Sequence, residues 1–367
     1  MTDPRPWLAL KSVPGVGNLL FRRLVVHFGT PQAVFSSDRP ALQAVPGVSA
    51  RLAAAIAGHR PAESIDREWD AVQKKGYRII TQTDCDYPVL LIQIPDPPPV
   101  LYVYGTLPAD DLAIAVVGSR RCTDYGVGTT KRLCMELVRQ GVTIVSGMAR
   151  GIDTAAHAGA IAGGGNTVSV LGTGLDRIYP RENRRLYHQI AENGAVVSEF
   201  ALGTGPDAHH FPARNRIISG MSHGTVVVEA TARSGSLITA RLAADQGRDV
   251  FAVPGNIHSF KSVGTHALIN EGAKLVVHAG DVLEEFAHFS PAGRAEPAPP
   301  ASGAPTLTEA EAMVMNTLEP DPIHIDDLAR KLEFPSGRLA GLLLQLELKG
   351  LVIQSPGKRF ASAAGLR

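Results

Sequence analysis

Three glycine-rich turns, each at the end of an apolar run, are the residues of the sequence best suited to hold an anion. The first contains Gly118, Ser119 and Arg120, the second Gly147, Arg150 and Gly151, and the third Gly172, Thr173 and Gly174. Glycine frees the backbone for close approach, and N–H groups at the start of a helix attract phosphate together with nearby arginines. The three turns together predict a crevice lined for phosphate groups.

An aromatic residue and two arginines form a second group. Phe211 precedes Arg214, Asn215 and Arg216 within one short segment. Guanidinium groups hold phosphates bidentately, and base stacking on an aromatic ring contributes ~1–3 kcal/mol per base regardless of sequence. The group favours single-stranded nucleic acid. The alternative is that Phe211 belongs to the core and the arginines pair with Glu199 or Glu229.

Two serines stand where a strand is joined to a helix. Ser234 and Ser236 flank Gly235 in this junction. Their hydroxyls could donate to a phosphate, and they serve equally well as helix caps. Both interpretations stay open.

Signatures of other chemistries are missing. The sequence has neither the GxGxxG dinucleotide fingerprint nor the GxxxxGK[ST] phosphate loop, so no nucleotide cofactor is expected. Asp153 and His157 are one helical turn apart, and His209, His210 and His223 follow later, but no HExxH, paired-carboxylate or GxSxG pattern accompanies them. We therefore predict no metal site and no catalytic activity.

Composition limits where a polyanion could bind. The 367 residues include 36 Lys+Arg and 35 Asp+Glu, a formal charge of +1, so a nucleic-acid site must be a local basic cluster. The three cysteines lack CxxC spacing, which favours reduced packing residues. No secretion signal and no apolar run near the ~18 residues of a membrane span is found, which predicts a cytoplasmic protein.

The elements that must position these residues form an α/β domain. Apolar β-branched runs at 113–118, 142–147, 167–172 and 225–230 alternate with segments of helical periodicity. This alternation is typical of a doubly wound parallel sheet, in which the turns after the strands meet at one edge. We predict an extended Rossmann-like domain over residues 63–288.

The N-terminal residues contain an internal repeat. Val13-Pro14-Gly15-Val16-Gly17 recurs as Val45-Pro46-Gly47-Val48-Ser49, each followed by an apolar helical stretch. The pattern predicts a helical domain of the helix-hairpin-helix or SAM-like type over residues 1–62. Such turns either hold one DNA phosphate or build a domain for protein contacts.

The C-terminal region has a different organisation. A Pro/Ala-rich linker is predicted for residues 289–305. Three short helices and a hairpin follow, which is the order of a winged-helix domain over residues 306–367. Lys358 and Arg359 lie on the predicted wing, whereas the third helix offers only Arg338 and Lys349. Both DNA binding and protein docking stay open for this domain.

Six motifs of the central region resemble those of the DNA-processing protein A family, also called DprA or Smf. They occur in the family's order between about residues 66 and 286: GSR from Gly118, SGMARGIDTAAH from Ser146, GTGLDRIYPRENRRL from Gly172, HFPARNRIISG from His210, VVVEATARSGSLITARLAADQGRDVFAVPG from Val226 and ALINEGAKLV from Ala267. Met148 replaces the family's usual leucine, a change of similar volume.

The resemblance implies a protein that binds single-stranded DNA without catalysis. Such proteins protect incoming DNA and load the RecA recombinase during natural transformation. Duplex DNA is a further candidate partner. The implied DNA pocket is lined by Arg120, Arg150, Phe211, Arg214 and Arg216.

The resemblance also implies a homodimer. Leu268, Ile269 and Leu275 lie at the matching motif and are the candidates for its face. Two alternatives remain. One is a nucleotide-binding enzyme of the phosphoribohydrolase type, although its PGGxGTxxE signature is missing, and the other is an interaction scaffold built from the flanking domains.

Overall fold

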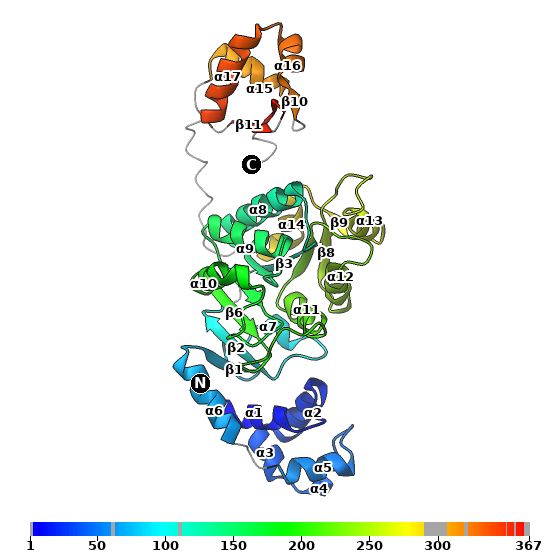
Figure 1. The fold of residues 1–367 in the computed structure, drawn as a ribbon. Coiled ribbons are helices and arrows are strands. Elements are labelled where there is room, and N and C mark those ends of the chain that lie inside the picture. Colours follow the sequence, from blue (N-terminus) through cyan, green and yellow to red (C-terminus); the bar gives the residue numbers. More distant parts are fainter. Residues whose placement is uncertain are drawn as a thin grey trace. The chain divides into compact units, whose positions relative to one another are not determined.

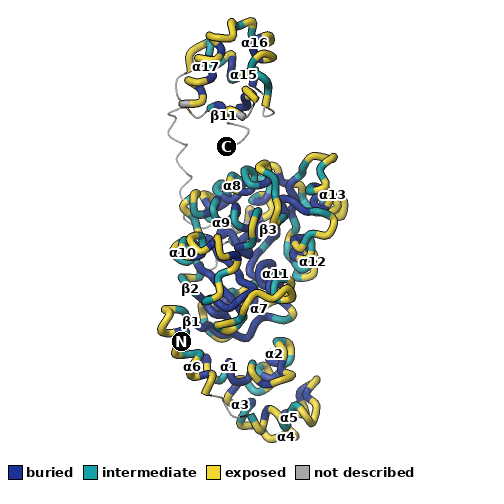
Figure 2. The backbone as a smooth tube through the Cα atoms, viewed as in Figure 1, coloured by how far each residue is buried: buried dark blue, intermediate teal, exposed yellow. Residues whose placement is uncertain are grey.

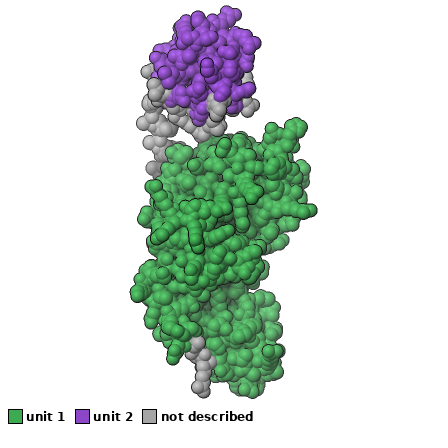
Figure 3. All heavy atoms as spheres, viewed as in Figure 1, with its two compact units in different colours: residues 1–287 green, residues 288–367 purple. Residues whose placement is uncertain are grey.

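The protein is described by a computed structural model that covers residues 3–59, 63–108, 112–289, 307–318, 322–349, 351–355 and 357–362. The chain divides into two units, Met1–Ala287 and His288–Arg367, which Figure 3 distinguishes by colour. Residues 290–305 of the predicted linker lie outside the described residues.

A nine-stranded sheet forms the centre of the first unit (Figure 1). Its order is β1-β2-β6-β5-β4-β3-β7-β8-β9. The strands are β1 (Arg78–Thr81), β2 (Val100–Gly105), β3 (Ala113–Val117), β4 (Thr143–Ser146), β5 (Thr167–Val170), β6 (Gly194–Ser198), β7 (Gly224–Val227), β8 (Asp249–Ala252) and β9 (Lys274–Leu275).

The strand order identifies the type of sheet. From β5 through β4, β3, β7 and β8 to β9, neighbouring strands are parallel and follow the Rossmann order 3-2-1-4-5-6. β6 extends this sheet in parallel, and β2 and β1 continue it by antiparallel pairing. The predicted extended Rossmann-like doubly wound sheet is confirmed.

Helices cover both faces of the sheet, so its central strands are buried along their whole length (Figure 2). Ile114 and Val116 of β3 pack in one core with residues of α8 and α9, whereas Ala115 and Val117 pack in another with residues of α11 and α12. From residue 63 onward the helices are α6 (Glu63–Lys74), α7 (Val89–Ile92), α8 (Asp124–Arg139), α9 (Ile152–Ala162), η1 (Arg181–Asn183), α10 (Arg184–Glu192), α11 (His210–Gly220), α12 (Gly235–Asp245), α13 (Val263–Asn270), α14 (Ala279–Leu283) and η2 (Glu284–Phe289).

Five short helices precede α6: α1 (Arg5–Ser12), α2 (Asn18–Phe28), α3 (Pro31–Ser36), α4 (Arg39–Gln43) and α5 (Ala50–Ala57). The two Pro-Gly turns have the same left-handed backbone, with φ +95° at both Gly15 and Gly47. Trp7 stacks on Phe21 in a core that continues into the sheet domain. The helix-hairpin-helix prediction agrees with this arrangement.

The second unit has the winged-helix order of elements. Helices α15 (Glu309–Thr317), α16 (Ile325–Leu332) and α17 (Ser336–Leu348) enclose an apolar core, and strands β10 (Ile323–His324), β11 (Val352–Ser355) and β12 (Arg359–Ser362) pair in the order β10-β12-β11. Glu311 completes the capping box of α15 and accepts hydrogen bonds from Lys349 at 2.7 and 2.8 Å. Lys349 is therefore engaged within the unit.

Candidate nucleic-acid interface

A cavity of about 660 Å³ lies at the carboxyl ends of β3 and β7. These adjacent strands connect to opposite halves of the sheet, and open α/β sheets bind ligands in the crevice where the strand order reverses. Residues from the loops after both strands and from α11 and α12 line the cavity. We call this cavity the cleft.

The structure brings about half of the predicted site residues to the cleft. Those that line it are Gly118, Ser119, Arg120, Phe211, Arg214, Asn215, Ser234 and Ser236. Those that do not are Gly147, Arg150, Gly151, Gly172, Thr173, Gly174 and Arg216. The first glycine turn and the two helix starts therefore form the cleft, and the other two turns lie beneath or beside it.

Arg120 is the exposed cation of the cleft. Its guanidinium carbon lies 5.4 Å from the centre of the Phe211 ring, and Tyr179, which is 44% exposed, lies 5.5 Å from the same ring. Among the residues that the structure describes, Arg120 forms no ion pair. A charge and aromatic faces are therefore available together, as stacking of a base beside a phosphate requires.

Arg214 is a buried cation at the floor of the cleft. Its Nη1 donates to the carbonyl oxygens of Gly147, at 2.8 Å, and Val170. Burial lowers the pKa of Arg214 to about 10, partly offset by the negative charge of Asp153, so the guanidinium stays protonated at neutral pH. Within the described residues its Nε atom has no hydrogen-bond partner.

Arg214 thus joins the ends of β4 and β5 and supplies positive potential from below the cleft surface. Asp153, at the start of α9, also lines the floor, and burial raises the pKa of its carboxyl group. Asp153 was not among the predicted site residues. Its position two residues after the second glycine turn was the available signal.

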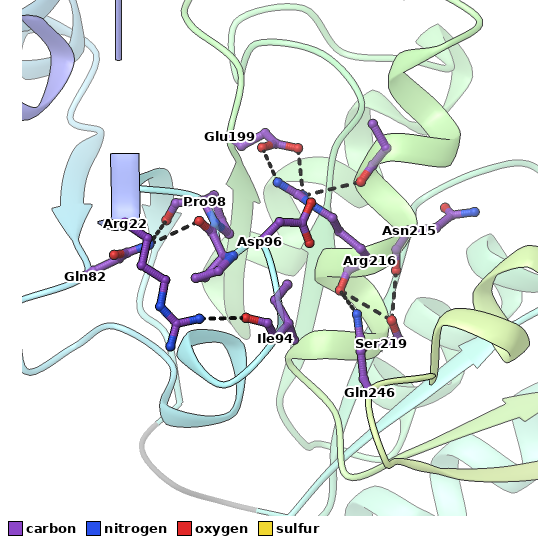
Figure 4. Close-up of polar contacts among 12 residues, drawn as sticks. Arg22, Gln82, Ile94, Asp96, Pro98, Glu199, Asn215, Arg216, Ser219 and Gln246 are labelled. Carbon is purple, nitrogen blue, oxygen red and sulfur yellow. Dashed lines mark hydrogen bonds and ion pairs between the residues drawn. The ribbon is translucent and has the colours of Figure 1, made fainter. Parts of the chain in front are cut away.

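Arg216 corrects one expectation. Its Nη1 and Nη2 donate to Glu199 at 2.9 and 2.7 Å, and its Nε donates to Asp96 at 2.7 Å (Figure 4). The side chain is buried and faces away from the cleft because α11 turns positions 214 and 216 in different directions. Pairing with Glu199, the alternative left open by the sequence, is what occurs, so Arg216 is not a phosphate ligand in this arrangement.

Arg150 is exposed and forms an ion pair with Glu182 of η1. An ion pair between exposed side chains contributes only about 0–1 kcal/mol, so the Arg150 guanidinium could exchange this contact for another anion at little cost. Arg150 lies outside the cleft lining, and its predicted role in DNA binding stays a prediction.

The glycines of the second and third turns serve packing more than ligand approach. Gly151 has φ +77°, and a Cβ atom there would lie 2.3 Å from the carbonyl oxygen of Ser119. A Cβ atom on Gly172 would lie 2.9 Å from the Phe211 ring. These positions therefore hold the Arg120 loop and the aromatic ring in place. Thr173 is buried and donates to Arg177, and a Cβ on Gly174 would meet the Ala201 carbonyl.

Of the two interpretations left open by the sequence, helix capping is what the structure shows for Ser234, and donation to a phosphate stays a prediction. Ser234 is the N-cap of α12, and its Oγ accepts from Ser236 N and lies 2.8 Å from Ser236 Oγ. Both residues also line the cleft. The start of α12 consequently faces the cavity, where its dipole favours an anion.

The residues proposed for a dimer face differ in exposure. Leu268 is buried in the core that one face of the sheet forms with residues of α11 and α12, so it has little surface to offer a partner. Ile269 is partly buried, and Leu275 is 43% exposed. Of the three, Leu275 is the best placed to meet another chain.

His157 is a buried neutral histidine. Thr167 Oγ1 donates to the carbonyl oxygen of Ile144 at 2.9 Å, so it accepts from His157 Nδ1, 2.7 Å away. Burial, and then the charge of Arg214, lowers the pKa of His157 to about 3. Over the described residues, no group of three potential ligands could hold a metal ion.

The depressed pKa predicts an acid-sensitive fold. Between about pH 6.5 and 3 the unfolded chain binds a proton at His157 that the folded chain does not, so stability is lost as the pH falls. We expect this residue alone to lower the free energy of unfolding by about 1 kcal/mol from pH 7 to pH 5.5. Urea unfolding at both pH values measures the loss, which His157→Gln should reduce by that amount. An equal pH dependence in both proteins would contradict a neutral His157.

No helix among the described residues is long and apolar enough to cross a bilayer.

Three family models match the chain. Residues 78–287 match the family described as DNA recombination-mediator protein A. Residues 296–358 match a DprA winged helix domain, and residues 8–57 match a SAM-like helix-hairpin-helix tandem.

Relatives and solved structures agree with these matches. Protein Smf of Synechocystis is 35% identical, with 96% of this chain and 97% of that protein covered. DNA processing protein A of Streptococcus pneumoniae superposes with a TM-score of 0.67 at 36% identity, over 78% of this chain and 99% of that one. The Helicobacter pylori protein, whose structure was described for its single-stranded DNA binding mode, has a TM-score of 0.52 at 30% identity, over 58% and 96%. The chain belongs to the DNA recombination-mediator protein A family, also named DprA or Smf.

Proposed function

We propose that this protein binds single-stranded DNA in the cleft and acts, without catalysis, as a recombination mediator in natural transformation. In this role it protects incoming DNA in the cytoplasm and helps to load the RecA recombinase, as a homodimer. The observation that carries the proposal is the exposed Arg120 guanidinium over the Phe211 ring at the open cleft. The single-stranded DNA binding of the Helicobacter pylori relative supports it.

The geometry favours a strand over a duplex. Phe211 and Tyr179 offer ring faces at the cleft, and a base can stack on them only when its own face is free, whereas the faces of bases inside a duplex are covered by the neighbouring base pairs. Ser234, Ser236 and Arg120 supply donors for the phosphates between those bases. Because every base has a stacking face, binding should depend little on sequence.

Removal of the Arg120 charge tests the proposal. We expect Arg120→Ala to weaken binding of labelled oligonucleotides about tenfold, whatever their sequence, and to lower the slope of log K against log salt by about 0.7–1. Fluorescence anisotropy over a range of salt concentrations measures both quantities. Competition with duplexes and with free nucleotides then ranks the ligands.

Arg139→Ala is the matched control. Arg139 is exposed in the last turn of α8, a helix of 16 residues that follows the Arg120 loop in the sequence, so the substitution removes the same charge about 24 Å from the start of that helix. It should leave affinity and slope unchanged. Equal behaviour of the two variants would count against the cleft as the binding site.

A further inference from the structure

The N-terminal helices are joined to the sheet domain by polar contacts as well as by their shared core. Lys11, at the end of α1, donates from Nζ to the carbonyl oxygen of Glu199 at 2.5 Å. Arg22 of α2 donates from Nη1 to the carbonyl oxygen of Ile94 at 3.1 Å (Figure 4). Two separate helices therefore hold two separate segments of the sheet domain.

Both of those segments lie against α11. The Glu199 carboxylate receives the two hydrogen bonds of Arg216. Ile94 packs so closely on Gly220 that a Cβ atom there would lie 2.9 Å from its side chain. On its other flank α11 is held by α12, where Gln246 Nε2 donates to the Arg216 carbonyl oxygen at 3.1 Å.

The charges of this junction depend on one another. Burial lowers the pKa of Lys11, whereas the negative charge of Glu199 raises it and the nearby Arg216 lowers it again. Lys11 and Arg216 are thus two cations near Glu199; the negative charge of Glu68 also acts on Lys11, and Asp96 pairs with Arg216. A change at Lys11 must therefore alter the surroundings of Arg216.

The same helix forms one wall of the cleft. Phe211, Arg214 and Asn215 line the cavity, and Arg216 follows directly in the sequence. A rotation of α11 by a few degrees would move the aromatic ring and the buried cation together.

We propose that Lys11 and Arg22 are positioning residues for DNA binding: through Glu199 and Ile94 they fix α11, so the N-terminal helices set the positions of the side chains in the cleft. This inference rests on the proposed function. It assigns the N-terminal helices a role in affinity without contact to DNA.

The salt dependence of binding distinguishes positioning from contact. We expect Lys11→Met and Arg22→Met to weaken oligonucleotide binding about three- to tenfold with an unchanged slope of log K against log salt, since no phosphate contact is lost. Lys74→Met, which removes an exposed charge from α6, should change neither quantity. Circular dichroism at the assay temperature confirms that each variant is folded.

Two results would overturn the inference. Unchanged affinity of the folded variants would reduce Lys11 and Arg22 to structural contacts. A slope lowered by about one would make them phosphate ligands instead.

Tryptophan fluorescence provides a second readout. The two tryptophans of the sequence are Trp7 in α1 and Trp69 in α6. Because coupling between sites is reciprocal, an oligonucleotide in the cleft should raise the melting temperature seen by these residues, and less so in Lys11→Met. If bound DNA did not change the melting temperature measured by tryptophan fluorescence, only the coupling between the N-terminal helices and the cleft would be contradicted. Failure of the wild-type chain to bind any oligonucleotide would instead contradict the proposed function.

Discussion

Replacement of Arg216 by methionine should lower the free energy of unfolding by about 3–5 kcal/mol, because removal of one partner from a buried ion pair leaves the other charge unpaired. The side chains of Arg216 and Glu199 are each only 10% exposed, so little water can replace the lost hydrogen bonds. Urea unfolding followed by circular dichroism measures the effect. The protein that remains folded should bind oligonucleotides with an unchanged salt slope.

A double-mutant comparison identifies the cause. Arg216→Met combined with Glu199→Gln should be less destabilised than the two single changes added together, since the second change removes the stranded charge. Arg241→Met, an exposed arginine of α12, should alter stability by no more than about 0.5 kcal/mol. The opposite result would be a free energy of unfolding for Arg216→Met equal to that of Arg241→Met, together with a lower slope of log K against log salt. Arg216 would then contact DNA, and its ion pair with Glu199 would not be its main role.

Arg216 shows where sequence reasoning about the site reaches its limit. Arg214 and Arg216 are the same type of residue, and either guanidinium could bind a phosphate. Their different roles depend on hydrogen-bond acceptors that are distant in the sequence. Arg216 binds the carboxylates of Glu199 and Asp96, whereas Arg214 binds the carbonyl oxygens of Gly147 and Val170. Only the folded chain brings these acceptors to α11.

The fold could be predicted from the sequence more completely than the site, because it depends on patterns that are local in the sequence. The buried strands β3, β4, β5 and β7 appear as continuous β-branched runs, since a parallel sheet covered by helices on both faces has no polar side. The exposed Arg120 was likewise predictable from the turn that follows β3, at the edge where such sheets bind ligands. The antiparallel extension through β2 and β1 was not, because no local signal sets strand order.

The glycine turns were identified correctly as special positions, but their reason differs in part from the one expected. Gly118 lines the cleft as predicted, whereas Gly151 and Gly172 make room for the Ser119 carbonyl oxygen and the Phe211 ring. A glycine that admits a ligand and a glycine that admits a neighbouring loop look the same in a sequence. The distinction has a measurable consequence for stability.

Gly151→Ala should lower the free energy of unfolding by about 2–5 kcal/mol, from a strained backbone and a steric overlap together. The residue has φ +77° and ψ −122°, a conformation that alanine strongly disfavours. The new Cβ would meet the Ser119 carbonyl oxygen at 2.3 Å, where Ile152 N now donates a hydrogen bond at 3.2 Å. Relief of the overlap must shift Ser119 and with it Arg120, so oligonucleotide affinity should fall as well.

Gly128→Ala provides the matched control within the same unit. Gly128 lies inside α8, and a Cβ atom there would have no neighbour within 4 Å. Because glycine in a helix interior costs about 0.5–1 kcal/mol relative to alanine, this change should stabilise the protein slightly and leave DNA binding intact. Thermal melting of the two variants therefore moves in opposite directions if Gly151 holds the Arg120 loop in place. Two melting temperatures that rise together would mean that the loop tolerates a side chain at position 151, and the contact between the two turns would then not be what positions Arg120.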